Sequence, residues 1–259
     1  EAEYIPSQFR SVISNPDLLR LNYGIFALHL ILMASFVVVP LQLRDAGLSS
    51  GNHWWVYLPV LVTSMAMIIP FVIIAEKKRR MKTVFLGAIG LTLVANLGFS
   101  LLHDQLSGLI VCLWVFFCGF NLLEATLPSL ISKTAPGDLK GTAMGIYSSA
   151  QFIGAFLGGA AGGWLYGHYG VESVFWFSVA VAFSWLVIAW FMSPPRYVAN
   201  LLLSLRGIPA EQSERFSKEL LAIPGVEEVS LYFDEQSAYL KVDNQVLDKQ
   251  QLSRFLSQW

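Results

Sequence analysis

Six apolar stretches, each about as long as a helix that crosses a lipid bilayer, occupy the chain between Asn22 and Met192. About 20 helical residues are needed to cross roughly 30 Å of hydrocarbon. A soluble domain carries about 25% charged residues, whereas this chain has 14% charged and 55% hydrophobic residues. The sequence therefore predicts an all-α polytopic membrane protein, with spans at residues 22–43, 54–75, 83–102, 109–131, 142–166 and 174–192.

Positive charge appears in every second connection between these spans. The second and fourth spans are followed by seven basic residues, whereas the opposite connections hold one, Arg44. Because basic loops stay on the cytoplasmic side of the membrane, both termini are predicted to be cytoplasmic. The seven residues are Lys77, Lys78, Arg79, Arg80, Lys82, Lys133 and Lys140.

A second, soluble domain is predicted to begin at residue 193, where Pro194 and Pro195 end the helical pattern. Residues 198–208 read as a strand and 210–223 as a helix. Two further strands, 226–234 and 238–242, precede an amphipathic helix at 246–259. This βαββα order predicts a small α+β ferredoxin-like domain over residues 193–259.

The run from Pro224 to Val229 and the later segment 238–242 resemble the small heavy-metal-associated domains. Those domains hold their metal with two cysteines between the first strand and the first helix. Residues 207–213 here contain no cysteine, so neither a metal site nor a cofactor is predicted. Regulation, ligand sensing, self-association and simple stabilisation remain alternative roles for this domain.

Glu124 is the most informative side chain of the membrane part, because it lies well inside the fourth span. Hydrocarbon disfavours a charged carboxylate, so an unpaired Glu124 would keep a proton until water or a cation arrives. Asn121 lies one turn earlier, and Pro128 leaves the Glu124 carbonyl without its usual helical donor. These features predict a proton-coupling site; the alternative is a protonated glutamate that bonds to a neighbouring helix.

Other polar residues within the spans are candidates for a substrate or proton pathway. His29 in the first span is a second ionisable group. Each of these side chains has the alternative role of a hydrogen bond between helices. With His29 the candidates are Asn22, Tyr23, Asn96, Tyr147 and Gln151.

Small residues form two adjacent rows on the fifth span. Gly154, Gly158 and Gly162 recur every four residues, with Gly159 and Gly163 in the second row beside Ala155. Rows of this kind allow two helix backbones to approach closely. They predict a tight helix crossing, which is either permanent or a sliding contact between two bundles.

Three segments resemble the second half of the major facilitator superfamily. They are the loop 75–82, the exit 127–132 and the entry 141–145 into the glycine-rich span. The resemblance implies secondary active transport by alternating access, with one six-helix bundle present here and an N-terminal six-helix half missing. It also implies a charge network at the cytoplasmic loops, for which the inside preference of basic residues is an alternative explanation. Its members would be Glu76, Arg79, Arg80, Asp138, Lys140 and Gly141.

The resulting functional hypothesis is a proton-coupled exporter of small amphipathic molecules in the inner membrane of a bacterium. Residues 1–20 would then be the cytoplasmic linker to the missing half, and residues 21–192 the membrane bundle. Its partners would be the lipid bilayer, a small-molecule substrate and protons. The alternative is a six-span anchor or sensor whose soluble domain binds a ligand or partner. Neither an enzyme nor nucleic-acid binding is predicted, because the sequence has no nucleophile or phosphate-binding pattern and its net charge is −1.

Overall fold

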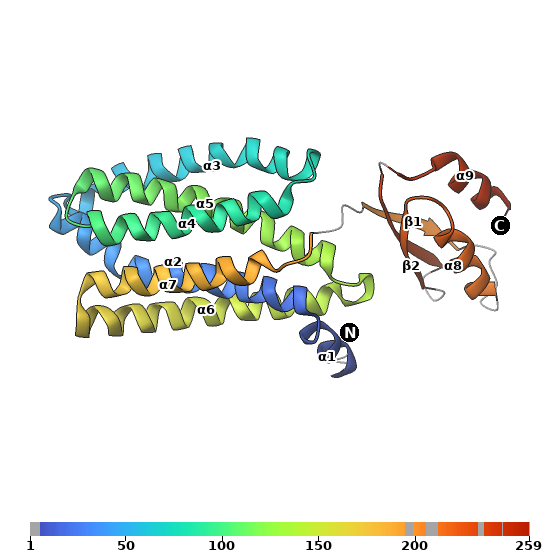
Figure 1. The fold of residues 1–259 in the computed structure, drawn as a ribbon, viewed down its shortest axis with the longest axis horizontal. Coiled ribbons are helices and arrows are strands. Elements are labelled where there is room, and N and C mark those ends of the chain that lie inside the picture. Colours follow the sequence, from blue (N-terminus) through green and yellow to red (C-terminus); the bar gives the residue numbers. More distant parts are fainter. Residues whose placement is uncertain (1–5, 195–198, 206–211, 233–235, 245, 259) are drawn as a thin grey trace. The chain divides into compact units, whose positions relative to one another are not determined.

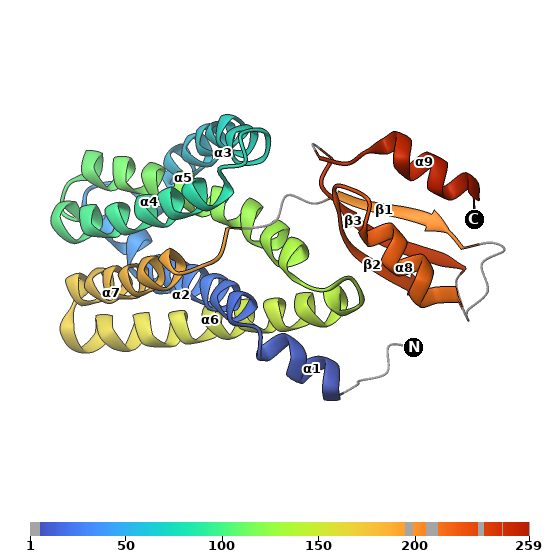
Figure 2. The same ribbon diagram turned by 45° about the vertical axis from the view of Figure 1, so that its right-hand side comes forward.

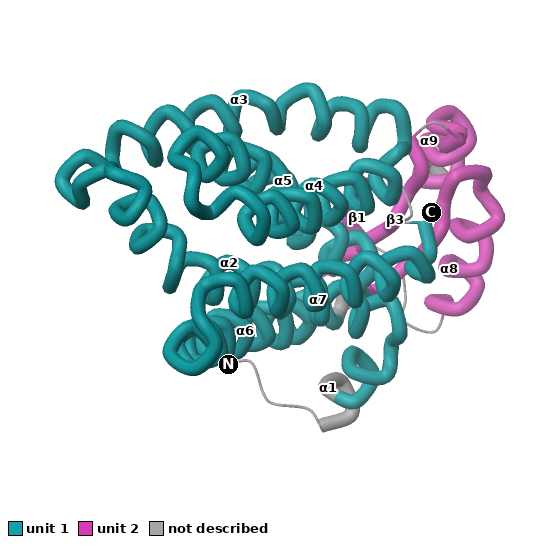
Figure 3. Tube along the Cα trace, turned by 60° about the vertical axis from the view of Figure 1, so that its left-hand side comes forward, with its two compact units in different colours: residues 1–135, 139–195 teal, residues 136–138, 196–259 magenta. Residues whose placement is uncertain are grey.

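The computed structural model describes residues 6–194, 199–205, 212–232, 236–244 and 246–258. The chain divides into a helical unit and a smaller α/β unit, which Figure 3 draws in different colours. The helical unit contains α1 (Pro6–Ile13), α2 (Pro16–Asp45), η1 (Ser50–Asn52), α3 (Trp54–Lys77), α4 (Met81–Leu102), α5 (Leu106–Thr134), α6 (Lys140–Tyr169) and α7 (Val171–Trp190).

Five stretches among the described residues are long and apolar enough to cross a membrane: α2, the segment Ser50–Lys77 with α3, α4, α5 and α7. They correspond to five of the six predicted spans. The remaining predicted span is α6, a helix of 30 residues. Its glycines and polar side chains make it less apolar than the others, so that α6 crosses a membrane stays a prediction.

The first long helix starts before the apolar stretch that predicted it. Asn15 caps α2, since its side-chain oxygen accepts hydrogen bonds from the backbone N–H groups of Asp17 at 3.0 Å and Leu18 at 3.2 Å. Pro16 occupies the first turn, where a missing N–H costs nothing. The cap therefore begins the helix in a polar segment, which hydropathy alone does not detect.

Helix α2 lies at the centre of the bundle and α3 lies at its edge. Buried residues make up 56% of the most apolar window of α2 but only 17% of that of α3. The views in Figures 1 and 2 show α2 beside α6 and α7, and α3 packs mainly against α5. Among the described helices of the bundle, much of α3 thus has no packing partner.

The closest helix contact joins α2 to α6 through the predicted glycine row. A Cβ atom built on Gly162 would lie 2.7 Å from the Cα atom of Ala34. Gly158 meets the backbone of Leu30 and Gly154 that of Phe26 in the same way. The residue numbers of the contacting positions rise together along α2 and α6, so the two helices run parallel. The second row is different, since nothing lies within 4 Å of a Cβ atom on Gly159 or Gly163.

The smaller unit contains β1 (Ala199–Ser204), α8 (Ser213–Leu221), β2 (Val226–Tyr232), β3 (Ser237–Val242) and α9 (Lys249–Gln258). Its three strands form a sheet in the order β1-β3-β2, and both neighbouring pairs are antiparallel. Phe216 and Leu220 of α8 are fully buried with Ala238 and Leu240 of β3. The small α+β unit thus has the predicted order of elements. Residues 207–211 of the segment compared with the heavy-metal-associated domains lie outside the described residues.

We expect the substitution Gly225→Ala to destabilise the smaller unit. Gly225 has a backbone φ of 88°, which side chains other than glycine rarely adopt, and an added Cβ atom would meet the backbone of Leu247. Strain and overlap together should cost about 2 kcal/mol or more. Hydrogen–deuterium exchange of the full-length variant should then show faster exchange in β2, β3 and α9, with the membrane helices unchanged. Unchanged protection of these elements would contradict the prediction.

Candidate functional site

Three polar side chains from three different helices meet inside the bundle. His29 comes from α2, Glu124 from α5 and Gln151 from α6. The imidazole Nε2 atom of His29 lies 2.8 Å from the amide Nε2 atom of Gln151 and 3.9 Å from Oε2 of Glu124. The structure therefore brings together three of the predicted site residues, which are far apart in the sequence.

His29 is held on its other sides by its own helix and by an aromatic ring. Its Nδ1 atom lies 3.3 Å from the carbonyl oxygen of Ile25, one turn earlier on α2. The ring of Phe120 on α5 meets the imidazole edge to face at a centroid distance of 5.9 Å. The side chain of His29 is 12% exposed, so this ring has little freedom to turn.

Glu124 is more accessible than His29, and its carboxylate is incompletely bonded. Its side chain is 39% exposed, although its Oε2 atom is buried and has no hydrogen-bond partner among the described residues. A buried acceptor of this kind costs free energy until it gains a donor. Glu124 is therefore partly exposed, while one of its carboxylate oxygen atoms is buried and faces His29.

Tyr147 and Asn22 add further unpaired polar atoms within the bundle. Tyr147 of α6 is 3% exposed. Asn22 of α2 is 7% exposed. The hydroxyl of Tyr147 and both amide atoms of Asn22 are buried and lack a hydrogen-bond partner in the described part of the chain. Buried polar groups without protein partners are typical positions for internal water.

The other predicted pathway residues make hydrogen bonds between helices. The amide of Asn121 donates to the Ser64 hydroxyl on α3 at 3.0 Å, and the Tyr23 hydroxyl lies 2.6 Å from that of Ser184 on α7. Asn96 of α4 is fully buried and accepts a hydrogen bond from Ser35 of α2 at 3.2 Å. These contacts join neighbouring helices, and none of them involves Glu124.

Glu76 of the predicted loop network forms an ion pair with Lys133, a residue that the prediction did not include. Lys133 near the end of α5 donates to both carboxylate oxygens of Glu76 on α3, at 2.7 and 2.8 Å. Arg79 has a backbone φ of 52° in the turn between α3 and α4, and Arg80 follows it as the residue before α4. Asp138 lies in the short helix η2 (Gly137–Leu139). Lys140 and Gly141 begin α6, so the loop residues lie directly at helix ends.

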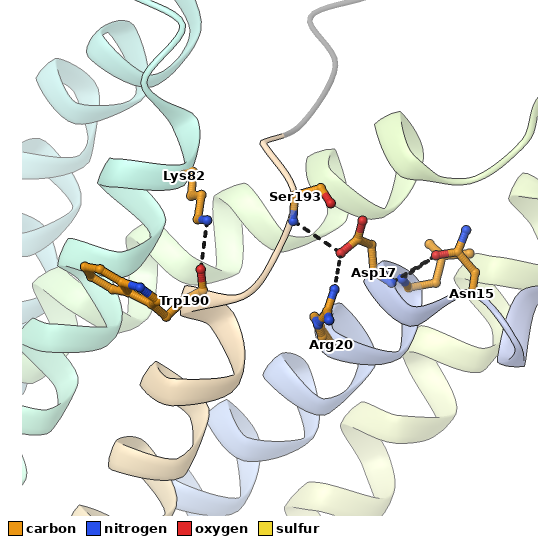
Figure 4. A network of polar contacts seen from close by, with 7 residues as sticks. Asn15, Asp17, Arg20, Lys82, Trp190 and Ser193 are labelled. Carbon is orange, nitrogen blue, oxygen red and sulfur yellow. Dashed lines mark hydrogen bonds and ion pairs between the residues drawn. The ribbon is translucent and has the colours of Figure 1, made fainter.

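Two further contacts at this end of the bundle were not predicted. The amine of Lys82 donates to the carbonyl oxygen of Trp190 at 2.8 Å. One carbonyl of the last turn of α7, which has no donor within the helix, thereby gains a hydrogen bond. Asp17 accepts hydrogen bonds from Arg20 at 2.7 Å and from the backbone N–H of Ser193 at 3.3 Å. Figure 4 shows these hydrogen bonds. Lys82 joins α4 to the end of α7, and Asp17 joins the start of α2 to the residues that follow α7.

Among the described residues, no group of three or more histidine, cysteine, aspartate or glutamate side chains is arranged to hold a metal ion. The site formed by His29, Glu124 and Gln151 offers one acid, one imidazole and one amide. Such a set can take up and release a proton.

Comparison with known proteins relates the chain to a family of transporters. Residues 2–159 and 129–218 match the family model described as Major Facilitator Superfamily. The chain is 40% identical over 260 residues to the inner membrane transport protein YajR of Escherichia coli (strain K12), covering 100% of this chain and 57% of the relative.

More distant relatives also bear the names of transport or resistance proteins. An uncharacterized transporter of Buchnera aphidicola subsp. Baizongia pistaciae is 29% identical over 189 residues, which is 70% of this chain and 46% of the relative. The multidrug resistance protein MdtG of Yersinia enterocolitica is 28% identical over 164 residues, with coverages of 59% and 37%. The chain thus spans about half the length, or less, of the curated relatives it matches.

Proposed function

Because the chain belongs to the Major Facilitator Superfamily, we propose that it forms one six-helix half of a transporter that exports small amphipathic molecules in exchange for protons. Helices α2 to α7 would form this half and would alternate between inward-open and outward-open states together with a second half. The resistance protein among the relatives supports export. The observation that carries the proton coupling is the partly exposed Glu124 beside His29.

The chemistry of this pair suits coupling between a proton and a substrate. The side chain of Glu124 is partly exposed, whereas one of its oxygen atoms is buried without a donor among the described residues. Ionisable groups inside a membrane are costly and typically mark ion or proton pathways. Asn22, Tyr23, Asn96, Asn121 and Tyr147 would then support the site by fixing its helices or holding water, whereas Gln151 and His29 contact each other within it.

The face left open by this chain suits a second helical half as its partner. Large apolar side chains are exposed along α3 and α6, including Met65, Ile69, Phe152 and Phe156. The chain covers 57% of the length of the Escherichia coli relative, which leaves room for such a half.

The proposed location is the inner membrane of a bacterium, with both ends of the membrane bundle in the cytoplasm. The basic residues around Lys82 and Lys133 lie at the end of the bundle where α2 begins and α7 ends. This placement follows the inside preference of basic loops. The same side would hold the charge network of Glu76, Arg79, Arg80, Asp138, Lys140 and Gly141.

For the smaller unit we propose a ferredoxin-like fold. β3 lies between β1 and β2 and is antiparallel to both, which is the pairing of a split βαβ motif. Its own buried core supports a separate role in regulation. The sensor hypothesis would make this unit the functional part and the membrane helices its anchor. Membership in a transporter family favours the transporter hypothesis over the sensor hypothesis.

Transport by the full-length protein in proteoliposomes tests the proposal directly. With a panel of lipophilic cations, we expect substrate movement to depend on a pH gradient and to stop when a protonophore removes it. Deleting residues 196–259 should change the rate but keep the dependence on the gradient. Movement of no substrate under any gradient would favour the sensor hypothesis instead.

A further inference from the structure

The contacts of His29 define where its proton lies. The amide nitrogen of Gln151 can only donate, and it lies 2.8 Å from Nε2 of the imidazole. Nε2 must therefore be the acceptor of this hydrogen bond. The carbonyl oxygen of Ile25 can only accept, and it lies 3.3 Å from Nδ1. Both contacts are satisfied by a single form of the ring, a neutral imidazole with its proton on Nδ1.

The same arrangement leaves Glu124 without a hydrogen bond to His29. The distance of 3.9 Å between Nε2 and Oε2 exceeds the 2.7–3.2 Å of an N–H···O bond by about 1 Å. No N–H group is available in between, since Nε2 already uses its lone pair to accept from Gln151. The cluster thus contains a buried acceptor, Oε2 of Glu124, and none of its N–H groups donates to this oxygen.

A proton that binds to Nε2 changes the contacts of His29 with both Gln151 and Glu124. The new Nε2–H bond would point at the amide N–H of Gln151, so two donors would face each other and their hydrogen bond would break. Oε2 of Glu124, an acceptor without a partner among the described residues, lies 3.9 Å from Nε2. A movement of about 1 Å would form a charge-assisted hydrogen bond between the imidazolium and the carboxylate. The positive charge gained by the ring is balanced by the negative charge of Glu124.

We infer that Gln151 and Glu124 are alternative hydrogen-bond partners of His29. Gln151 is a positioning residue that holds the imidazole in its neutral form. When the ring gains a proton, Glu124 replaces Gln151 as its partner. This inference rests on the proposed proton coupling. Protonation would exchange a side-chain bond between α2 and α6 for one between α2 and α5. The helix whose partner changes is the central helix of the bundle.

The surroundings of His29 favour this exchange over other outcomes. On α5 it faces Glu124 and the ring of Phe120. On α6 it faces Gln151, and Tyr147 of that helix has a buried hydroxyl without a partner among the described residues. On the side of α7, Tyr23 of α2 is turned to Ser184. Among the described groups, Glu124 is therefore the acid placed to receive the protonated ring.

The position of Gln151 is fixed by the backbone. Gly154 lies one turn later on α6, and its backbone contacts that of Phe26 on α2. No side chain separates the two helices at this level, so the distance between residues 29 and 151 cannot adjust through a change of rotamer at the crossing. The backbone separation of α2 and α6 at this level is therefore set by the crossing, and the side chains of His29 and Gln151 meet across it.

Nuclear magnetic resonance of the full-length protein in lipid, labelled with ¹⁵N-histidine, tests the inference. The substitution His29→Asn identifies the signals of this ring by their loss. We expect the neutral ring to carry its proton on Nδ1, and a lower pH to protonate Nε2. In Gln151→Glu a carboxylate replaces the donor, so the ring should carry both protons at a pH at which the wild-type ring is neutral. Gln151→Met should change the Nε2 signal and leave Nδ1 as it is.

A matched control and a transport readout complete the experiment. Ser149→Ala, on the same helix, removes a hydroxyl that bonds only within α6 among the described contacts, and it should leave the ring unchanged. Gln151→Glu should also move the pH profile of transport toward alkaline pH by about one unit or more. A neutral ring protonated on Nε2, or a ring unaffected by Gln151→Glu, would overturn the inference. Transport without proton coupling but with the expected ring signals would instead contradict the proposed function.

Discussion

Replacing Glu124 by glutamine is expected to abolish transport driven by a pH gradient. Glutamine has nearly the same shape as glutamate but cannot take up or release a proton. It also cannot balance the charge of a protonated His29, whose Nε2 atom lies 3.9 Å from the carboxylate. We expect transport driven by the gradient to fall by about a hundredfold or more, as when a positioned proton-transfer group is removed from an enzyme.

The measurement is substrate movement by the full-length protein in proteoliposomes, at several pH values, with and without a gradient. Glu227→Gln is a suitable control because it removes the same charge from an exposed position of β2 in the smaller unit. Substrate binding at a fixed pH should survive Glu124→Gln, which separates loss of coupling from loss of the folded protein. Unchanged activity across the pH range would show that Glu124 is a structural residue.

The substitution Gly158→Ala is expected to destabilise the helical unit strongly. An added Cβ atom would overlap the backbone of Leu30 on α2, and a backbone cannot move aside as a flexible side chain can. Overpacking of this kind costs about 1–3 kcal/mol, and the cost should lie at the upper end here. Close packing is also what holds helices together in lipid, where the hydrophobic effect contributes little.

The neighbouring glycine provides the control on the same helix. Gly159→Ala adds the same methyl group, but nothing lies within 4 Å of it. We expect Gly159→Ala to retain the wild-type melting temperature in detergent, whereas Gly158→Ala lowers it by several degrees and reduces the yield of monodisperse protein. Equal melting temperatures for the two variants would mean that the contact between α2 and α6 is looser than described.

The sequence was sufficient to predict the membrane helices because their signal is local. Long apolar stretches can satisfy their backbone in lipid only as helices or closed barrels, and five of the predicted spans are found as such helices. The glycine spacing on α6 likewise predicted a close crossing. It did not identify α2 as the partner, nor that Gly154, Gly158 and Gly162 are packed while Gly159 and Gly163 are open.

The candidate site was only partly predictable because its contacts depend on how the helices align. His29 and Gln151 are 122 residues apart, and no local pattern fixes the alignment of their helices. Asn121 was expected beside Glu124 from its place one turn earlier, yet its amide bonds to Ser64 on α3. The carbonyl of Trp190 and the amine of Lys82 are a similar case, since a helix end and a distant lysine give no joint signal in the sequence.

The parallel crossing of α2 and α6 has a mechanical consequence. Two helices in backbone contact over Phe26, Leu30 and Ala34 have no layer of side chains that could deform between them. The pair should therefore resist bending and sliding and behave as one stiff double rod. If the bundle changes shape during a transport cycle, the movement must occur at other helix contacts. Those of α3 are the first candidates, because α3 has the smallest buried share of the candidate spans.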